Sequence, residues 1–348
     1  MVQTRAFTDG FDLYPATTGQ AGFGVFSTWL GNSSTFSLIE GRFGGQAARI
    51  AGNGVVQRYR TFADSLYGSC GFAFRQLASG AMGIIMLSSL DGTAQLTLCY
   101  TAAGQLAWRR GGDPYNSPVF AVTSTQKIFP NVWHYIEVEW RIDDVIGTLK
   151  LYLDGVEVPE LTYTGDTRSS GTGTGIGRFG ILAQTGVSHD YDDIYVEIGS
   201  AAGENVRVGE GRMEVLPVSE DVSNTGFTPS AGTKLYPTMA NVPADIASSS
   251  GADAQGSVMR LKHKPLASPP EKVYGVQLVN LSQKTEAGTR IIRNKIWSGA
   301  AEGNGANQAE QLNTSTFKED WISKNPDGSV NWTGASVNAS EIGVEITT

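Results

Sequence analysis

Cysteine and histidine are scarce in this chain of 348 residues, which contains two cysteines and three histidines. A single pair of cysteines cannot form a disulfide framework, and no CxxC spacing is present to hold a metal. Cys70 and Cys99 lie in apolar alternating runs, so we expect two buried thiols, while a disulfide between them stays open. His134 alternates in phase with apolar neighbours and is expected to be buried and hydrogen-bonded, whereas His263, in the run KHK, is expected to be exposed.

Positive charge and long apolar runs are also limited. The net charge is −8, and neither the part before residue 200 nor the part after it is basic, so nucleic acid is not an expected partner. No apolar window of about 18 residues occurs, and the N-terminal residues lack the apolar core of a signal peptide. We expect a protein made in the cytoplasm, without membrane insertion.

Catalytic and cofactor motifs are missing as well. The sequence has no GxSxG elbow and no HExxH pattern, and GTGTGIG at 171–177 leads into a strand pattern where a dinucleotide site needs a helix. We expect no cofactor. Asp9, Asp12, Asp192 and Asp193 would converge if the first and last strands of this region pair, but short carboxylates more often cap turns, and we assign no metal.

Glycine is abundant, at 43 residues, and it punctuates short runs of apolar and β-branched residues. About a dozen short strands are predicted in the first 200 residues, a number that suits a two-sheet jelly-roll sandwich. Asp91-Gly92 and Asp154-Gly155 carry the chemistry of hairpin turns. Long helices are not expected.

The segment WHYIEVEWRIDDVIGTLKLYLDG, residues 133–155, is the strongest strand signal and predicts two long strands joined by a turn. Apolar and polar residues alternate with a period of two, so one face is expected in a core and the other toward solvent. The core set is Ile136, Val138, Trp140 and Ile142, and the solvent set is Tyr135, Glu137, Glu139 and Arg141.

The composition predicts two domains, a sandwich over residues 1–199 and a smaller β-rich domain over 206–348, joined by the linker GSAAGEN. In the second domain we expect strands at 206–217, 272–285, 290–297 and 342–346. A short helix is expected at 314–323, because Phe317 and Trp321 are four residues apart.

Two functions are considered for such a sandwich, glycoside hydrolysis and sugar binding. Glycoside hydrolysis needs two carboxyl groups, and Glu137 and Glu139 share a strand face about 7 Å apart, although EVEWRI does not match the ExDxxE of retaining glucanases on this fold. Sugar binding needs exposed aromatic rings beside polar groups. The candidates for sugar binding are Trp108, Arg109, Tyr115, Tyr135 and Tyr152.

The runs YDDIYVEIG and WHYIEVEWRIDDVIGTLKLYLDG resemble the concanavalin A-like, laminin G-like sandwiches. The later runs NVRVGEGRMEVLPVSED, GFTPSAG, VYGVQLVNLSQKTEAGTRIIRNKI and NPDGSVNWTGASVNASEIGVEI resemble the C-terminal part of structural proteins of tailed bacteriophages. The order of motifs is the same over most of residues 7–346. Phe227 stands where related chains tend to have Trp, and Glu204-Asn205 where Gly-Asp is expected.

The resemblance implies a non-enzymatic virion component with a concanavalin A-like jelly roll followed by a docking or oligomerising domain. We predict a protein of the tail tip, baseplate or fibre, released by lysis, whose partners are other virion proteins, further copies of itself on a symmetric particle, and host surface glycans. A capsid decoration or collar protein with a structural role is the alternative, and a glycan depolymerase is a lesser one.

Overall fold

The computed structural model describes residues 3–14, 29–31, 36–51, 56–112, 124–169, 171–184, 186–245 and 247–348. The described residues form two compact units. The first takes in residues 3–11 and continues to Met213, and the second takes in Asp12–Tyr14 and Glu214–Thr348. Regular structure is almost entirely strand, which confirms the prediction of a mainly β chain. Within the described ranges, no helix is long and apolar enough to cross a membrane.

The first unit is built from short antiparallel strands and one turn of 3-10 helix. They are β1 (Thr4–Asp9), β2 (Leu30–Gly31), β3 (Phe36–Glu40), β4 (Gln46–Ala51), β5 (Val56–Ser65), β6 (Tyr67–Gln76), β7 (Met82–Ser88), β8 (Ala94–Tyr100), β9 (Leu106–Arg110), β10 (His134–Arg141), β11 (Gly147–Leu153), β12 (Val156–Glu157), η1 (Pro159–Leu161), β13 (Tyr163–Gly165), β14 (Ile176–Ala183) and β15 (Ser188–Gly199).

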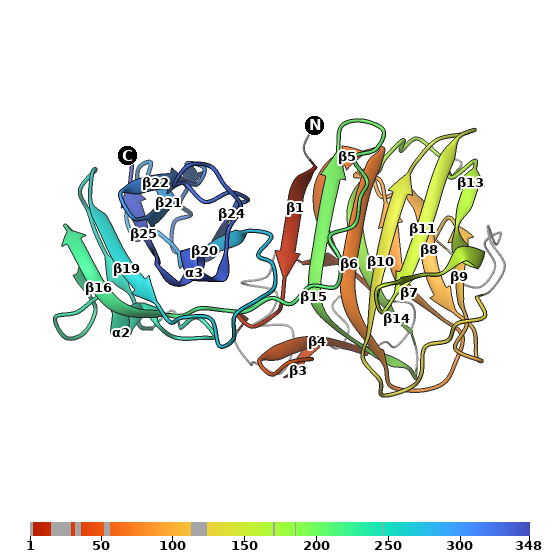
Figure 1. The fold of residues 1–348 in the computed structure, drawn as a ribbon. Coiled ribbons are helices and arrows are strands. Elements are labelled where there is room, and N and C mark those ends of the chain that lie inside the picture. Colours follow the sequence, from red (N-terminus) through yellow and green to blue (C-terminus); the bar gives the residue numbers. More distant parts are fainter. Residues whose placement is uncertain are drawn as a thin grey trace. The chain divides into compact units, whose positions relative to one another are not determined.

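These strands form two sheets (Figure 1). The nine-stranded sheet has the order β12-β11-β10-β6-β15-β4-β3, with β1 added on β15 and β13 on β11, and the six-stranded sheet has the order β2-β5-β14-β7-β8-β9. The sheets pack face to face: the rings of Phe72 on β6 and Phe179 on β14 are 5.8 Å apart, and the Tyr191 hydroxyl of β15 donates to the Ile84 carbonyl of β7 at 2.7 Å. The predicted sandwich is confirmed.

The β10–β11 hairpin confirms the core half of the period-two prediction. Ile136, Val138 and Trp140 are wholly buried. After β11 the chain turns at Asp154 and Gly155, whose φ angles of 51° and 80° are both positive. This pair of left-handed residues is what a two-residue hairpin turn requires, and Asn or Asp followed by Gly adopts it at least cost.

Both cysteines are buried and unpaired, as expected. Cys70 lies on β6 and Cys99 on β8, in different sheets, and burial raises the pKa of each thiol. His134 is buried and bonded, also as expected. Its Nδ1 lies 2.8 Å from the Asp154 carboxylate, and its Nε2 accepts the Phe129 amide at 3.2 Å, which places the proton of the neutral ring on Nδ1.

A third histidine, His189, is enclosed between the sheets. Its Nδ1 lies 2.7 Å from the Leu182 carbonyl, which can only accept, so Nδ1 donates there and Nε2 accepts from the Tyr100 hydroxyl at 2.8 Å. Burial lowers the pKa of His189 to about 4. The ring is therefore neutral in the folded chain near neutral pH.

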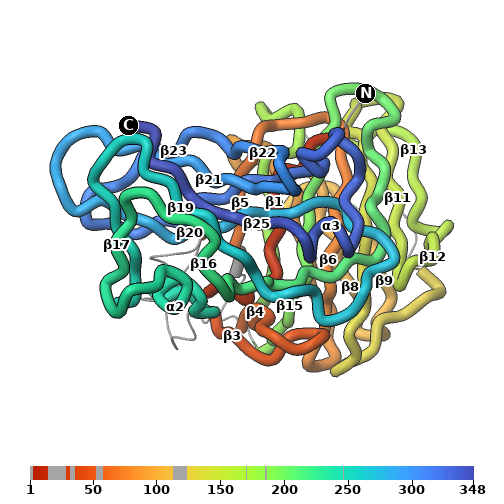
Figure 2. Tube along the Cα trace, turned by 60° about the vertical axis from the view of Figure 1, so that its left-hand side comes forward, coloured from red at the N-terminus to blue at the C-terminus, as the bar shows by residue number. Residues whose placement is uncertain are grey.

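The second unit has its own strands and two short helices. They are β16 (Val218–Thr225), β17 (Thr228–Pro229), α2 (Tyr236–Met239), β18 (Ser250–Gly251), β19 (Val258–His263), β20 (Val276–Ser282), β21 (Ile291–Ser298), β22 (Ala301–Asn304), β23 (Gln308–Ala309), β24 (Thr316–Ile322), α3 (Gly334–Asn338) and β25 (Ser340–Ile346). One sheet has the order β16-β19-β25-β21-β22, with β23 on β21 (Figure 2). Smaller sheets pair β17 with β18 and β20 with β24.

Three sequence expectations for the second half are wrong. The segment expected as a helix at 314–323 contains strand β24, whose residues pair one by one with β20. Residues 206–217 contain no strand. His263 is buried, because it follows Met259 and Leu261 on the core-facing side of β19 and its ring bonds the Lys264 carbonyl and the Ser340 hydroxyl.

The second unit also takes a residue from near the start of the chain. The ring of Tyr14 meets that of Phe317 on β24 edge to face, with centroids 5.7 Å apart and planes at 81°. Tyr14 is buried. Such edge-to-face pairs are a preferred aromatic geometry.

Candidate functional site

Among the described residues, the aromatic side chains predicted to bind sugar are not gathered into one site. Trp108 on β9 and Tyr135 on β10 are wholly buried, so neither ring can stack on a sugar, and both assignments are corrected. Trp108 pairs with Leu98 and shares its core-facing side. Arg109 lies on the opposite side of β9, and Tyr152 on β11 is half-buried. Tyr115 lies outside the described residues.

The outer face of the nine-stranded sheet is covered in its middle by residues 206–213, which we call the strap. The Val208 amide donates to the Tyr195 hydroxyl at 2.9 Å, and the Met213 amide donates to the Asp193 carboxylate at 2.7 Å. The side chains of Val208 and Met213 pack on an apolar cluster formed by Ala73, Tyr135 and Tyr195. The solvent-facing phase predicted for β10 is therefore wrong, because a distant part of the chain covers it.

Glu137 is the polar centre beneath the strap. It is wholly buried, and its carboxylate accepts from the Tyr195 hydroxyl at 2.8 Å, the Gly209 amide at 2.7 Å and the Arg207 guanidinium at 2.5 Å. Burial acts to lower the pKa of Arg207, but the hydrogen bond to Glu137 and the charges of Glu137 and of the neighbouring tyrosines together raise it. Burial, and then the charge of Glu137, raise the pKa of Tyr195.

The neighbouring carboxylate, Glu139, is engaged in the same way. It accepts the Arg207 amide at 3.0 Å, while the Arg207 guanidinium lies 4.2 Å over the ring of Tyr152. Both glutamates considered for glycoside hydrolysis thus hold the strap in place. An acid–base pair needs carboxyl groups open to a substrate, and Glu137 does not meet this requirement.

Beyond the strap, the same sheet face carries a row of side chains at one level of neighbouring strands. Arg49 on β4 pairs with Asp190 on β15, which pairs with Arg75 on β6. Asp190 is wholly buried and is clamped between the two arginines: Arg49 bonds it at 2.7 and 3.0 Å, and Arg75 bonds it at 2.7 and 2.8 Å. Trp133 completes the row, with the Arg75 guanidinium 4.5 Å from its ring centre.

This Arg49–Asp190–Arg75–Trp133 row reaches solvent. The side chains of Arg49 and Arg75 are 33% and 23% exposed, and Trp133 is half-buried. The bond to Asp190 raises the pKa of Arg49 despite partial burial, so its charge is permanent. An arginine held by a buried carboxylate is preorganised, because its guanidinium no longer has to be ordered when a ligand binds.

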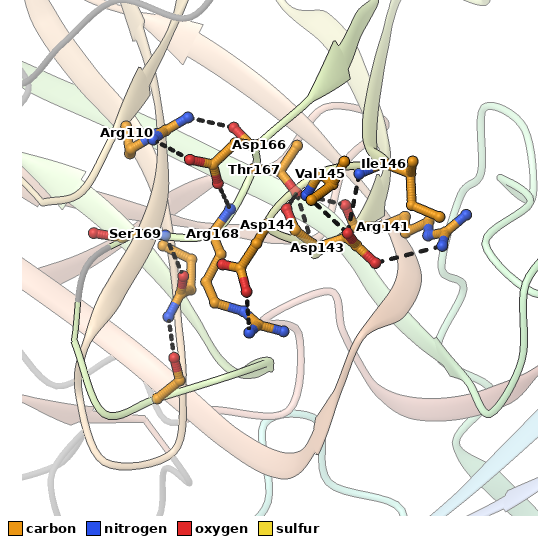
Figure 3. A network of polar contacts seen from close by, with 12 residues as sticks. Arg110, Arg141, Asp143, Asp144, Val145, Ile146, Asp166, Thr167, Arg168 and Ser169 are labelled. Carbon is orange, nitrogen blue, oxygen red and sulfur yellow. Dashed lines mark hydrogen bonds and ion pairs between the residues drawn. The ribbon is translucent and has the colours of Figure 1, made fainter.

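One end of the sandwich holds a second polar network, which braces the turn between β10 and β11 (Figure 3). The Asp143 carboxylate accepts the amides of Val145 and Ile146 at 2.9 and 3.0 Å, and the Thr167 hydroxyl donates to the Arg141 carbonyl at 2.7 Å. Arg168 bonds Asp144 at 2.8 Å. The turn is held firmly, yet Val145 and Ile146 are 74% and 52% exposed.

Three of the four aspartates that were considered for metal binding take separate partners, and the fourth, Asp12, belongs to the second unit. Strand β1 does pair with β15, and Asp9 lies opposite Ile194. However, each of these three carboxylates accepts a hydrogen bond from a different donor. Asp9 accepts from the Trp29 indole at 2.8 Å, Asp192 from the Arg42 amide at 2.8 Å, and Asp193 from the Met213 amide of the strap. In the described part of the chain, no group of three or more His, Cys, Asp or Glu side chains is placed to hold a metal ion.

The Arg49–Asp190–Arg75–Trp133 row was not predicted from the sequence, although the positions of its charged residues give a signal for it. Each of β4, β15 and β6 places a charged residue in an apolar run, in the phase opposite the core. Cross-strand pairing brings the three charges together. That pairing register is not contained in any single strand.

No protein-family model matches the sequence, and no curated protein matches it. Solved structures with a similar backbone include the cellulose induced protein Cip1, with 15% identity, TM-score 0.42, and coverage of 59% of this chain and 100% of that one. Another is the carbohydrate binding module CBM66 from Bacillus subtilis, with 14% identity, TM-score 0.36, and coverage of 49% and 96%.

A third similar structure comes from a phage. It is described as a carbohydrate esterase of the Shiga toxin-encoding bacteriophage phi24B, with 15% identity, TM-score 0.37, and coverage of 57% of this chain and 100% of that one. At these identities and scores the likenesses carry no argument about function. The sandwich assignment therefore rests on the strand order and core contacts of the chain itself.

Proposed function

We propose that this chain is a non-enzymatic structural protein of a tailed-bacteriophage virion whose sandwich contacts host surface glycans. The observation that carries the glycan contact is the Arg49–Asp190–Arg75–Trp133 row. It combines a half-buried indole with firmly held hydrogen-bond donors on a solvent-reaching part of a sheet. Aromatic surface beside oriented polar groups is the chemistry that sugar rings and hydroxyls require.

The virion role is supported by the order of sequence motifs, in which a sandwich precedes a second β-rich domain. The non-enzymatic role is supported by Glu137, which is wholly buried and bonded by the strap. Bonds of this kind suit a carboxylate that holds the fold together. A hydrolytic acid must instead lie beside the bond it cleaves.

Adsorption competition tests the glycan contact. Purified protein added to host cells is expected to reduce phage adsorption, and Trp133→Ala is expected to lose this effect while it still unfolds cooperatively above the assay temperature, although loss of the packed indole lowers its stability. Arg178→Gln, a change on the other sheet, serves as the matched control and should compete as wild type does. Competition by Trp133→Ala at wild-type strength would remove this surface from the proposal.

The position of the chain on the particle tests the virion role separately. Cryo-electron microscopy of intact particles is expected to place the chain at the tail tip, baseplate or fibre, with the Arg49–Asp190–Arg75–Trp133 row facing outward. Density on the capsid or collar, with that row packed on neighbouring subunits, would retire the attachment role.

A purely structural role, as a capsid decoration or collar protein, is the second candidate, and the exposed pair Val145 and Ile146 favours it. Subunit contacts bury apolar side chains, and a braced turn presents these two at little entropic cost. The double change Val145→Asp and Ile146→Asp should leave folding intact. Loss of incorporation into particles would support the structural role, and normal incorporation would count against it.

A further inference from the structure

The Arg49–Asp190–Arg75–Trp133 row has an unbalanced charge. It contains two guanidinium groups and one carboxylate. Asp190 is wholly buried, accepts three hydrogen bonds from the two arginines, and forms an ion pair with Nη2 of Arg75 at 2.7 Å. The row therefore keeps one net positive charge next to solvent. A partly desolvated positive charge of this kind favours a second anion.

The arginines also keep donors to spare. Arg49 uses Nε and Nη2 toward Asp190, and Arg75 likewise uses Nε and Nη2. No described residue is bonded by Nη1 of either side chain. A guanidinium presents five N–H donors in a planar fork, and an oxyanion is the group that uses such donors best.

Trp133 indicates that the ligand carries a ring, because part of its indole is accessible for stacking. Its ring is covered on one side by Arg75, and it packs with the apolar cluster under the strap, but it stays half-buried. A pyranose ring can lie against the accessible part of an indole while a substituent of the sugar reaches the neighbouring guanidinium groups.

We propose that this row recognises an acidic sugar, through an oxyanion on the ring that bonds Arg49 and Arg75 while the ring lies against Trp133. This inference rests on the proposed glycan contact and narrows it to anionic glycans. Asp190 acts as a positioning residue, because it touches the arginines and not the ligand. Carboxylate and phosphate share the required chemistry, and the experiment separates them.

Isothermal titration calorimetry of the full chain tests the proposal with three probes: an oligogalacturonate, the same oligomer as its methyl ester, and a phosphomannan. Wild type is expected to bind one or both anionic probes, and the ester at least about tenfold more weakly. Binding should weaken as salt concentration rises. The tighter of the two anionic probes identifies the oxyanion.

Variants keep the test specific. Arg49→Gln and Arg75→Gln should each weaken the anionic probe about tenfold or more, and Arg49→Lys, which keeps the charge but loses the fork, should fall between. Arg178→Gln should bind as wild type does. Unfolding temperatures identify any variant that fails to fold, and Arg49→Lys keeps the test decisive if Arg49→Gln is one of them.

Equal binding of the acid and the ester, or anionic binding that survives Arg49→Gln and Arg75→Gln, would overturn the inference. If a neutral glycan binds and Trp133→Ala abolishes that binding, the proposed glycan contact stands and only the acidic specificity fails. If wild type binds none of the probes and also fails to compete for adsorption, both proposals fall.

Discussion

The guanidinium of Arg207 reaches the carboxylate of Glu137, a buried residue seventy positions earlier in the chain. Arg207 belongs to the strap and Glu137 to the centre of the nine-stranded sheet. The contact converts what would be an open sheet face into a covered one. It also means that the segment after the last sandwich strand contributes to the stability of the sandwich.

Removing Arg207 is expected to destabilise the sandwich. Arg207→Met leaves the Glu137 charge buried with fewer donors, and we expect a loss of about 2 kcal/mol in the free energy of unfolding, reduced from the full buried-pair value because Arg207 is partly exposed. Urea unfolding measures it. Arg168→Met removes a more exposed ion pair with Asp144 and should change stability by less than about 0.5 kcal/mol. Equal effects of the two changes would contradict this account.

Gly71 is expected to tolerate no side chain. It lies opposite Tyr195, and a methyl group added there would come within 2.2 Å of the Tyr195 ring. That ring is held by its bonds to Glu137 and the Val208 amide, so Gly71→Ala should cost about 2–3 kcal/mol. Gly80→Ala is the matched control, since its added methyl would meet Val187 at an ordinary 3.6 Å. A neutral Gly71→Ala would show that the ring can move away.

Acid is expected to weaken the fold through His189. Its pKa is about 4 in the folded chain and about 6.5 when unfolded, so the unfolded chain takes up the proton first as the pH falls. Its contribution is complete above pH 6.5 and is lost toward pH 4. Between pH 7 and pH 4.5 the loss amounts to about 2–3 kcal/mol. Urea unfolding at the two pH values should show a smaller difference for His189→Gln, and an unchanged difference would exclude His189 as its source.

Arg58 and Arg60 should respond in opposite directions to the same substitution. Both are buried on β5, but Arg60 lies 3.5 Å from Asp9, while no described carboxylate is placed to pair with Arg58, and burial lowers the pKa of Arg58. Arg58→Met is expected to raise the free energy of unfolding by about 1 kcal/mol, because it removes a buried unpaired group. Arg60→Met is expected to lower it. Destabilisation by both would indicate that Arg58 has a counter-charge.

The core of the sandwich is predicted well from the sequence, because apolar and polar residues alternate with a period of two along a half-buried strand. Ile136, Val138 and Trp140 are an example, and all three are wholly buried. The opposite face of the same strand is mispredicted, because its cover comes from the strap. A local pattern shows which residues share a face, but not which distant segment lies on it.

The strand at β24 shows a second limit of local patterns. Phe317 and Trp321 are four residues apart, a spacing that puts two residues on one face of a helix and equally on one face of a strand. Pairing with β20 decides between the two. The Arg49–Asp190–Arg75–Trp133 row is hidden for a related reason, because its members are neighbours only once β4, β15 and β6 are in register.

The edge-to-face contact of Tyr14 with Phe317 has a consequence for biosynthesis. Tyr14 leaves the ribosome long before Phe317 does, yet both belong to the same compact unit. Domains made in sequence usually close as they emerge. Here one aromatic ring of the second unit, that of Tyr14, is synthesised before the rest of the unit. A fragment that starts at Glu214 would lack this ring. This aromatic contact of the second unit therefore forms only after residues separated by about three hundred positions have both been made.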